Sequence, residues 1–181
     1  MTARRYLPPY DSLTTGERRR RFGGLTALFA VTGIAIYLLL PDGMDTIVDF
    51  ELAGDDEVAV YLDTWRPDGL WRVAVAHIVD MAFLVAYGLG LALILDTVAR
   101  WSSPLSAGWA RLLARGAWLP IVAAGFDVIE NLAILVVLTD RTSGWPDLAA
   151  SAASIKFALL NVTYVLVVVA LVSAGITRLR R

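Results

Sequence analysis

Hydrophobic residues in this chain gather into four long runs, at about 22–40, 71–95, 117–138 and 148–176. Each run is close to the roughly 20 residues that an α-helix needs to cross a hydrocarbon core of about 30 Å. The runs lack the alternation of apolar and polar positions that marks a barrel strand, and a backbone in lipid has to satisfy its own hydrogen bonds. The pattern therefore predicts an all-α integral membrane four-helix bundle.

The first and second loops between these runs carry shorter helical patterns. In the outer loop 41–70, apolar residues recur at helical spacing behind three acidic residues that would occupy the first turn of a helix. We expect a short amphipathic helix at 55–65, lying on the outer surface. A second segment of this kind, around 105–115, is expected to rest among lipid headgroups on the inner side. The apolar face of the outer helix comprises Val58, Tyr61, Leu62 and Trp65.

The composition supports a membrane location. Hydrophobic residues make up 57% of the 181 residues, charged residues make up 18%, and the mean hydropathy is +0.63, which is too apolar for an ordinary soluble domain. The run 22–40 follows four arginines, as in a secretory signal, but it is long for one and PDGMD follows in place of a small-residue cleavage site. We expect it to remain as an anchor. Without repeats or linkers, the chain is predicted to form a single membrane domain over 1–181.

The arginines are distributed unevenly between the two sides of the predicted bundle. Both terminal segments and the 96–116 loop carry most of them, whereas the other two loops carry few. By the positive-inside rule both termini are cytoplasmic, and the 41–70 loop with its nine acidic residues faces outward. This predicts a multi-pass protein of the cell (plasma) membrane. The inner set is Arg4, Arg5, Arg18, Arg19, Arg20, Arg21, Arg100, Arg111, Arg115, Arg178, Arg180 and Arg181, and the outer set is Arg66, Arg72 and Arg141.

Polar and ionisable residues interrupt three of the four runs, most visibly in AGFDVIENLAILVVL at 124–138. At a rise of 1.5 Å per residue they lie roughly 10–17 Å below the outer surface. A charge that faced lipid there would cost about 2.5–3.5 kcal/mol, so these side chains are predicted to face one another in one layer. The layer comprises His77, Asp80, Asp127, Glu130, Asn131 and Lys156, and Tyr87 is included because it shares a helix face with Asp80.

This layer contains more acids than bases. Asp80, Asp127 and Glu130 accompany Lys156 alone if His77 is neutral, so full ionisation would leave a net charge near −2 in a medium of low dielectric constant. We therefore expect the carboxyl groups to share a proton. A carboxylic acid beside a carboxylate can shuttle protons, act as an acid or base, or bind a cation or amine.

Each of these residues also has a structural interpretation. A single histidine in a helix bundle is more often hydrogen-bonded structure than a ligand or base. Lys156 is compatible with a buried ion pair or with snorkelling to the outer headgroups. Asn131, Asn161 and Tyr164 are expected to form hydrogen bonds between helices. The Asp127 and Glu130 pair is harder to explain in this way, because neutral polar groups would serve at lower cost.

Close approach of the helices is predicted from small residues four positions apart. In the second run these are Ala82, Ala86 and Gly90, and in the fourth run they are Ala150, Ser154 and Ala158.

The first run contains no ionisable residue between Phe22 and Leu40 and is expected to serve as an apolar wall.

Four short motifs occur in order along residues 45–140. They are DFELAG at 49–54, EVAVYLDTW at 57–65, D-x-x-F-x-x-x-Y (Asp80, Phe83, Tyr87) and D-x-x-E-N (Asp127, Glu130, Asn131). This order resembles a group of uncharacterised bacterial four-span membrane proteins, which implies a bacterial inner membrane protein without an assigned activity. More faintly, AHIVDMAFLVAY at 76–87 is similar to the second span of emopamil-binding-type isomerases. Here the acid follows His77 by three positions and not four, and other landmarks of that family are missing.

We expect the polar layer to bind or process a membrane lipid or lipophilic small molecule in the outer half of the bilayer, with Asp80, Asp127 and Glu130 as acid/base or cation-pairing groups. The alternative is a non-catalytic accessory or structural subunit of a homo-oligomer or larger membrane complex. A proton-coupled carrier is disfavoured, because four helices without repeats lack alternating-access machinery. Whether the protein is an enzyme stays open.

Cofactors and nucleic-acid partners are not expected. The sequence has no Gly-rich phosphate loop and no basic surface interleaved with aromatic residues. A zinc site would need several histidine ligands, and the chain has one. We therefore predict no metal, although a carboxylate site from Asp80, Asp127 and Glu130 is an alternative.

Overall fold

The computed structural model describes residues 13–40, 44–65, 69–102, 106–139 and 144–179. The side chain of Arg178 and the predicted topology residues Arg4, Arg5, Arg66, Arg141, Arg180 and Arg181 lie outside this description. The described residues are all-α, as predicted. They form α1 (Thr15–Leu39), α2 (Met44–Leu52), α3 (Asp55–Thr64), α4 (Leu70–Ser102), α5 (Ala107–Gly116), α6 (Leu119–Thr139) and α7 (Trp145–Leu179).

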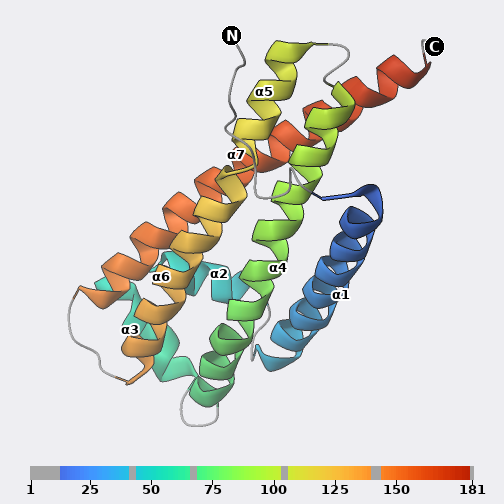
Figure 1. Ribbon diagram of the computed structural model, residues 1–181. Helices are drawn as coiled ribbons and strands as arrows, with labels where there is room; N and C mark the ends of the chain where they lie inside the picture. Colours follow the sequence, from blue (N-terminus) through green and yellow to red (C-terminus); the bar gives the residue numbers. More distant parts are fainter. Residues whose placement is uncertain (1–12, 41–43, 66–68, 103–105, 140–143, 180–181) are drawn as a thin grey trace.

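Four segments of the described chain are long and apolar enough to cross a membrane: α1, α4, α5 together with α6, and α7. This confirms a multi-pass membrane protein built as a helical bundle. In Figure 1, α4 runs through the bundle with α1 on one side, and it packs against α6 and α7 on the other. The α6 and α7 helices form the most extensive helix pair, whereas α1 packs mainly against α4 among the described helices.

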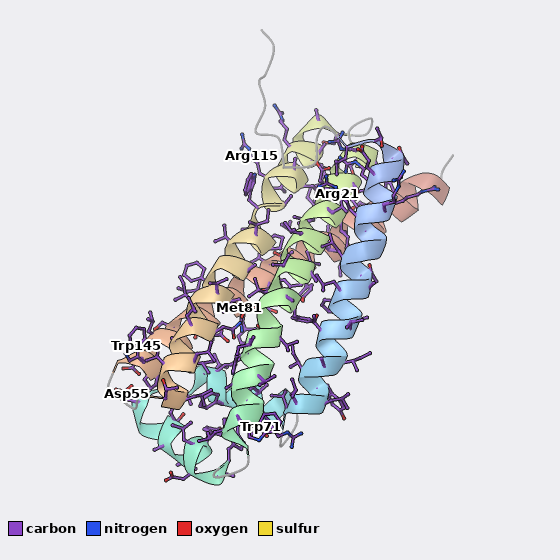
Figure 2. The ribbon with its side chains drawn as sticks, turned by 60° about the horizontal axis from the view of Figure 1, so that its bottom comes forward. Arg21, Asp55, Trp71, Met81, Arg115 and Trp145 are labelled. Atoms are coloured by element: carbon purple, nitrogen blue, oxygen red, sulfur yellow. The ribbon has the colours of Figure 1, made fainter. Side chains whose placement is uncertain are left out.

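The two ends of the bundle differ in charge. Figure 2 shows Arg21 and Arg115 at one end, and Asp55 and Trp71 at the opposite end. The start of α1 and the end of α7 lie toward the arginine-bearing end, and α2 and α3 lie at the other (Figure 1). The orientation of these ends in a cell membrane stays a prediction from the arginine distribution.

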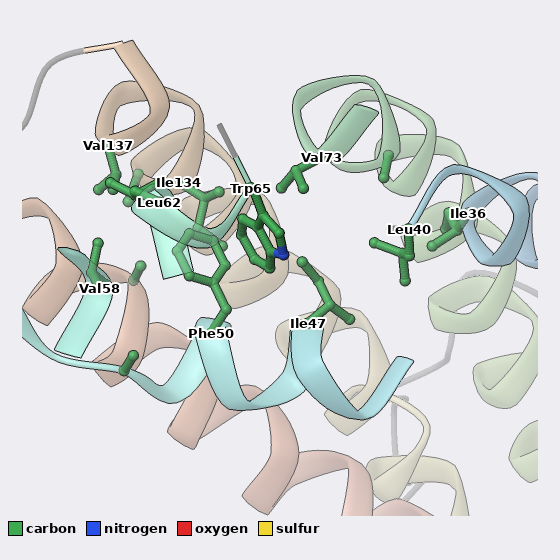
Figure 3. Packing of buried hydrophobic residues seen from close by; sticks show 14 residues of the cluster. Ile36, Leu40, Ile47, Phe50, Val58, Leu62, Trp65, Val73, Ile134 and Val137 are labelled. Atoms are coloured by element: carbon green, nitrogen blue, oxygen red, sulfur yellow. The ribbon is translucent and has the colours of Figure 1, made fainter. Parts of the chain in front are cut away.

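The segment between α1 and α4 folds beneath the bundle as two short helices. The predicted helix at 55–65 is α3, but its apolar face is buried against the bundle: Val58, Leu62 and Trp65 are at most 5% exposed. The sequence pattern did not predict α2, whose Phe50 is also buried. Figure 3 shows Phe50 beside Trp65, and their ring centroids are 4.8 Å apart. These contacts close one end of the bundle with a hydrophobic cluster that includes Ile134 and Val137 of α6.

Polar contacts fix α3 to the start of α7. The Gly144 backbone N–H donates to both carboxylate oxygens of Asp55, at 3.3 and 3.2 Å. In return the Asp55 backbone N–H donates to Asp147 Oδ1 at 3.4 Å. Gly144 has a φ of 96°, a left-handed conformation in which a side chain would be strained. The turn into α7 therefore depends on glycine.

The faces of closest helix approach differ in part from those predicted. On α4, the Cβ that Gly88 lacks would lie 3.0 Å from Ala124 Cβ and 3.3 Å from the carbonyl oxygen of Pro120, so α4 and α6 touch there. On α7, Ser154 and Ala158 are exposed, so the predicted small-residue stripe is wrong. The buried small face of α7 is Ala149, Ala152 and Ala153.

Gly88→Leu should destabilise the fold, because the added side chain would overlap α6 at a contact that is already close. Overpacking of this kind costs about 1–3 kcal/mol. Gly125→Leu is the matched control, since Gly125 is exposed on α6 and its added Cβ meets nothing within 4 Å. Thermal unfolding in detergent should give a lower Tm for Gly88→Leu and an unchanged or higher Tm for Gly125→Leu. Equal Tm values would contradict the α4–α6 contact.

Candidate functional site

Lys156 of α7 lies at the centre of a buried polar layer. Its Nζ is 2.7 Å from each carboxylate oxygen of Glu130 and 3.3 Å from Asp127 Oδ1, both on α6. It is also 3.1 Å from Glu51 Oε2 on α2. Only 5% of Lys156 is exposed, so the ammonium group is held in a buried ion-pair cluster and does not snorkel.

Helical spacing explains why these groups meet. Asp127, Glu130 and Asn131 occupy positions i, i+3 and i+4 of α6 and therefore share one face. All three are at most 4% exposed. On α7, Ala152 and Ala153 precede Lys156 by four and three residues, so the inward face has small side chains next to the lysine. The close packing of α6 and α7 brings the two faces together.

Asn131, which follows Glu130 on α6, forms hydrogen bonds to two residues of α4. Its amide Nδ2 donates to Asp80 Oδ2 at 2.7 Å, and its Oδ1 lies 2.7 Å from His77 Nδ1. Because an amide oxygen only accepts, His77 must donate from Nδ1. In the neutral ring Nε2 is then the acceptor nitrogen. His77 Nε2 is buried and has no hydrogen-bond partner among the described residues.

Tyr87 extends the layer toward the arginine-bearing end. Its hydroxyl donates to Asp127 Oδ2 at 2.6 Å, while the other oxygen of Asp127 faces Lys156. The structure therefore brings all seven predicted site residues into one buried layer across α4, α6 and α7. They form two bonded groups: His77, Asp80 and Asn131 in one, and Tyr87, Asp127, Glu130 and Lys156 in the other. A ligand role for these residues stays a prediction.

Two other polar residues behave differently from expectation. Asn161 and Tyr164 are exposed on α7, so their predicted role as buried partners between helices is wrong. At about 100° per residue, Asn161 and Tyr164 are rotated around α7 by roughly 140° and 80° from Lys156, so neither shares its buried face. The inward position on that stretch is taken by Thr163, which is fully buried and donates to the carbonyl oxygen of Leu159.

Glu51 is a further member of the layer, beyond the seven predicted residues. Its side chain is 13% exposed and bonds Lys156 across 105 residues of sequence. A signal was present, because Ile47 and Phe50 are apolar and Glu51 follows Ile47 by one helical turn. This spacing places Glu51 on the face that α2 buries. The many acids of the 41–70 loop predict a solvent-facing segment, and this hides the buried position of Glu51.

The charges in the layer do not balance by themselves. Lys156 is the one cation among four carboxyl groups, those of Glu51, Asp80, Asp127 and Glu130. Burying unbalanced charge in a medium of low dielectric constant is costly. The layer is therefore neutral only when it also carries protons or a cationic guest. Such a cluster is suited to receiving a proton or pairing with an amine.

A small cavity adjoins the layer between α1, α2 and α4. Its volume is about 70 Å³, and Glu51, His77 and Asp80 line it together with apolar residues that include Phe83. No group of three or more His, Cys, Asp or Glu side chains within the described residues is arranged to hold a metal ion. The cavity therefore combines three polar side chains with an otherwise apolar lining.

Comparisons of the chain with family models, with curated proteins and with solved structures give no match. The resemblance based on the DFELAG and D-x-x-E-N motifs stays a prediction.

Lys156→Met should destabilise the protein strongly, because it removes the only cation from a cluster of three carboxylates. Breaking a buried ion pair from one side costs about 3–5 kcal/mol. Lys156→Arg, which keeps the charge, is the control and should lose much less. The Tm of the purified protein in detergent measures both. A Tm for Lys156→Met equal to that of the unaltered protein would show that the cluster does not hold the bundle together.

Proposed function

We propose that this membrane protein binds, or acts on, a lipid or lipophilic small molecule whose polar group is received by Glu51, His77 and Asp80. The observation that carries the proposal is the cavity of about 70 Å³ lined by these three side chains. It is supported by His77 Nε2, which is buried and without a partner among the described residues. Unsatisfied buried polar atoms are rare in folded proteins and call for a reason.

The size of the cavity limits what can enter it. About 70 Å³ is far below the roughly 300–1,000 Å³ of usual ligand sites, so only a small polar part of a ligand is expected to enter it. A hydroxyl or an amine suits the lining. A hydroxyl would donate to His77 Nε2, and an amine would pair with the carboxylates of Glu51 or Asp80.

The rest of such a molecule would have to lie in an apolar environment. Gly33 and Ile36 of α1 and Phe83 of α4 line the cavity, and Phe83 stacks on Phe29 of α1 with ring centroids 4.5 Å apart. Only 11% of the apolar window of α1 is buried inside the protein. A small displacement of α1 from α4 would therefore open the cavity sideways to the bilayer. This favours a lipophilic ligand over a water-soluble one.

The residues around the cavity can also move a proton. His77 Nε2 would accept a proton from the bound group, and the resulting positive charge would be stabilised through Asn131 by Asp80. Glu51 lies on the same wall and can act as a second acid or base. The same arrangement serves binding alone when the ligand offers no labile proton.

A role as a structural subunit is the second candidate. The observation that favours it is that Lys156 has three carboxylate partners within this chain. Such a cluster can hold the helices together without any ligand. Stability and ligand content measured on the same variants separate the two functions.

Glu51→Gln should remove the ligand and leave most of the stability. The variant keeps the shape of the cavity wall, and Lys156 retains Asp127 and Glu130 as partners. Asp49→Asn is the matched control, because Asp49 is exposed on the same helix and loses the same charge. Mass spectrometry of lipophiles in the detergent-purified proteins should show about tenfold less bound molecule for Glu51→Gln, with a nearly unchanged Tm.

The structural candidate makes the opposite prediction. If the layer only locks the bundle, Glu51→Gln lowers the Tm and any lipophile content stays equal to that of Asp49→Asn. That outcome would overturn the proposed function.

A further inference from the structure

A second and larger opening lies at the arginine-bearing end of the bundle. It is a groove of about 810 Å³ between α1, α4 and α7, within the range of about 300–1,000 Å³ that is usual for ligand sites. Three arginines line it, Arg18 and Arg19 from α1 and Arg100 from α4. Most of the remaining lining is apolar, including Phe22 and Trp101. The groove thus has an apolar wall and a cationic rim, which is formed by Arg18, Arg19 and Arg100.

The described residues that line the groove include these three arginines and no acidic side chain. Asp96, which is 3% exposed, accepts from Arg18 at 2.6 Å and from Arg100 at 3.2 Å. These bonds also fix the two guanidinium groups at the edge of the groove. Glu17 is exposed and bonds Thr14 at 2.8 Å, and it does not line the groove. An anion is therefore the complement of this rim.

A narrower groove continues from this one toward the middle of the bundle. It has a volume of about 200 Å³, shares Phe22 and Ile94 with the larger groove, and reaches Tyr87 on α4. From Arg100 to Tyr87 the α4 helix rises by about 20 Å at 1.5 Å per residue. One leaflet of hydrocarbon is about 15 Å thick. The two grooves together therefore span about the depth of one leaflet, from a charged rim to an apolar interior.

We propose that these grooves bind one anionic phospholipid, with its phosphate against Arg19 and Arg100 and an acyl chain along α1 and α4 toward Tyr87. Arginine suits this role because its planar guanidinium matches phosphate oxygens. Basic pockets between membrane helices are known to hold anionic headgroups. The apolar continuation selects a lipid over a free phosphate, since a free anion would use the rim alone. The site shares no residue with the cavity at Glu51, His77 and Asp80, so its test is independent of the test of the proposed function.

The charge requirement is tested by two double variants of the full chain with equal charge loss. Arg19→Gln with Arg100→Gln removes two charges from the groove, while Arg18 still pairs with Asp96. Arg20→Gln with Arg21→Gln removes two exposed charges that do not line it. Native mass spectrometry in detergent with added phosphatidylglycerol should show about tenfold less bound lipid for the first pair and little change for the second.

The shape requirement is tested by two neighbouring glycines of α1. An added Cβ meets nothing within 4 Å at Gly23 or at Gly24, but only Gly23 is among the residues that line the groove. Gly23→Phe should fill the groove and displace phosphatidylglycerol, and Gly24→Phe should not. Both variants should keep the Tm of the unaltered protein in the absence of added lipid.

Four results would overturn the proposal. Equal loss of lipid in both arginine pairs would indicate general attraction to a basic end. Equal binding of phosphatidylcholine would remove the charge requirement, and unchanged binding in Gly23→Phe would remove the groove. If glycerol phosphate alone raised the Tm as much as phosphatidylglycerol does, the rim would be a site for a free anion and not for a lipid.

Discussion

The arrangement of the helices depends on one buried ammonium group and the carboxylates that surround it. Lys156 is 5% exposed in the middle of α7, and it contacts acids on α6 and α2 at 2.7–3.3 Å. An ammonium group left unpaired at this depth would cost several kcal/mol. The register of α6 against α7 is therefore set by the need to place Glu130 beside it. Glu51 adds a contact from α2, which is held under the bundle mainly by the hydrophobic cluster that Phe50 and Trp65 close (Figure 3).

The same constraint separates a tightly joined part of the molecule from a loosely joined one. Charges and hydrogen bonds of the polar layer connect α2, α4, α6 and α7, and α1 contributes no side chain to these bonds. Both openings lie along the border between α1 and α4: the small cavity at Gly33 and Phe83, and the larger groove at Arg18 and Arg100. A bilayer molecule that enters either opening has only apolar contacts of α1 to displace in the hydrocarbon region. Under both proposals, the α1–α4 border is therefore the side from which a ligand would enter.

Much of the fold and of the layer follows from the sequence because both rest on strong local rules. Apolar runs of membrane-spanning length give the four long helices, and the cost of charge in lipid forces Asp80, Glu130 and Lys156 to meet. Helical periodicity within a run then gives the shared face of Asp127, Glu130 and Asn131. These predictions need no knowledge of which helix packs against which.

The parts that sequence reasoning missed depend on contacts between distant segments. Glu51 and Ile47 lie in a loop whose burial comes only from the way α2 packs under the bundle, 105 residues from Lys156. The small-residue stripe at Ser154 and Ala158 was wrong because the inward face of α7 is fixed by Lys156, which places Ala152 and Ala153 inside instead. The larger groove was likewise not predicted, because the positive-inside rule alone accounts for Arg18, Arg19 and Arg100.

A double-mutant cycle between Lys156→Met and Glu130→Gln tests most directly whether the buried ammonium group organises the fold. Stability is measured in detergent for both single variants and the double variant. If the two groups act as one charge cluster, Glu130→Gln removes a stranded carboxylate from the Lys156→Met background, and the double variant is more stable than the sum of the single losses predicts. A coupling energy of about 1–3 kcal/mol is the expected result. Strictly additive losses would contradict the account.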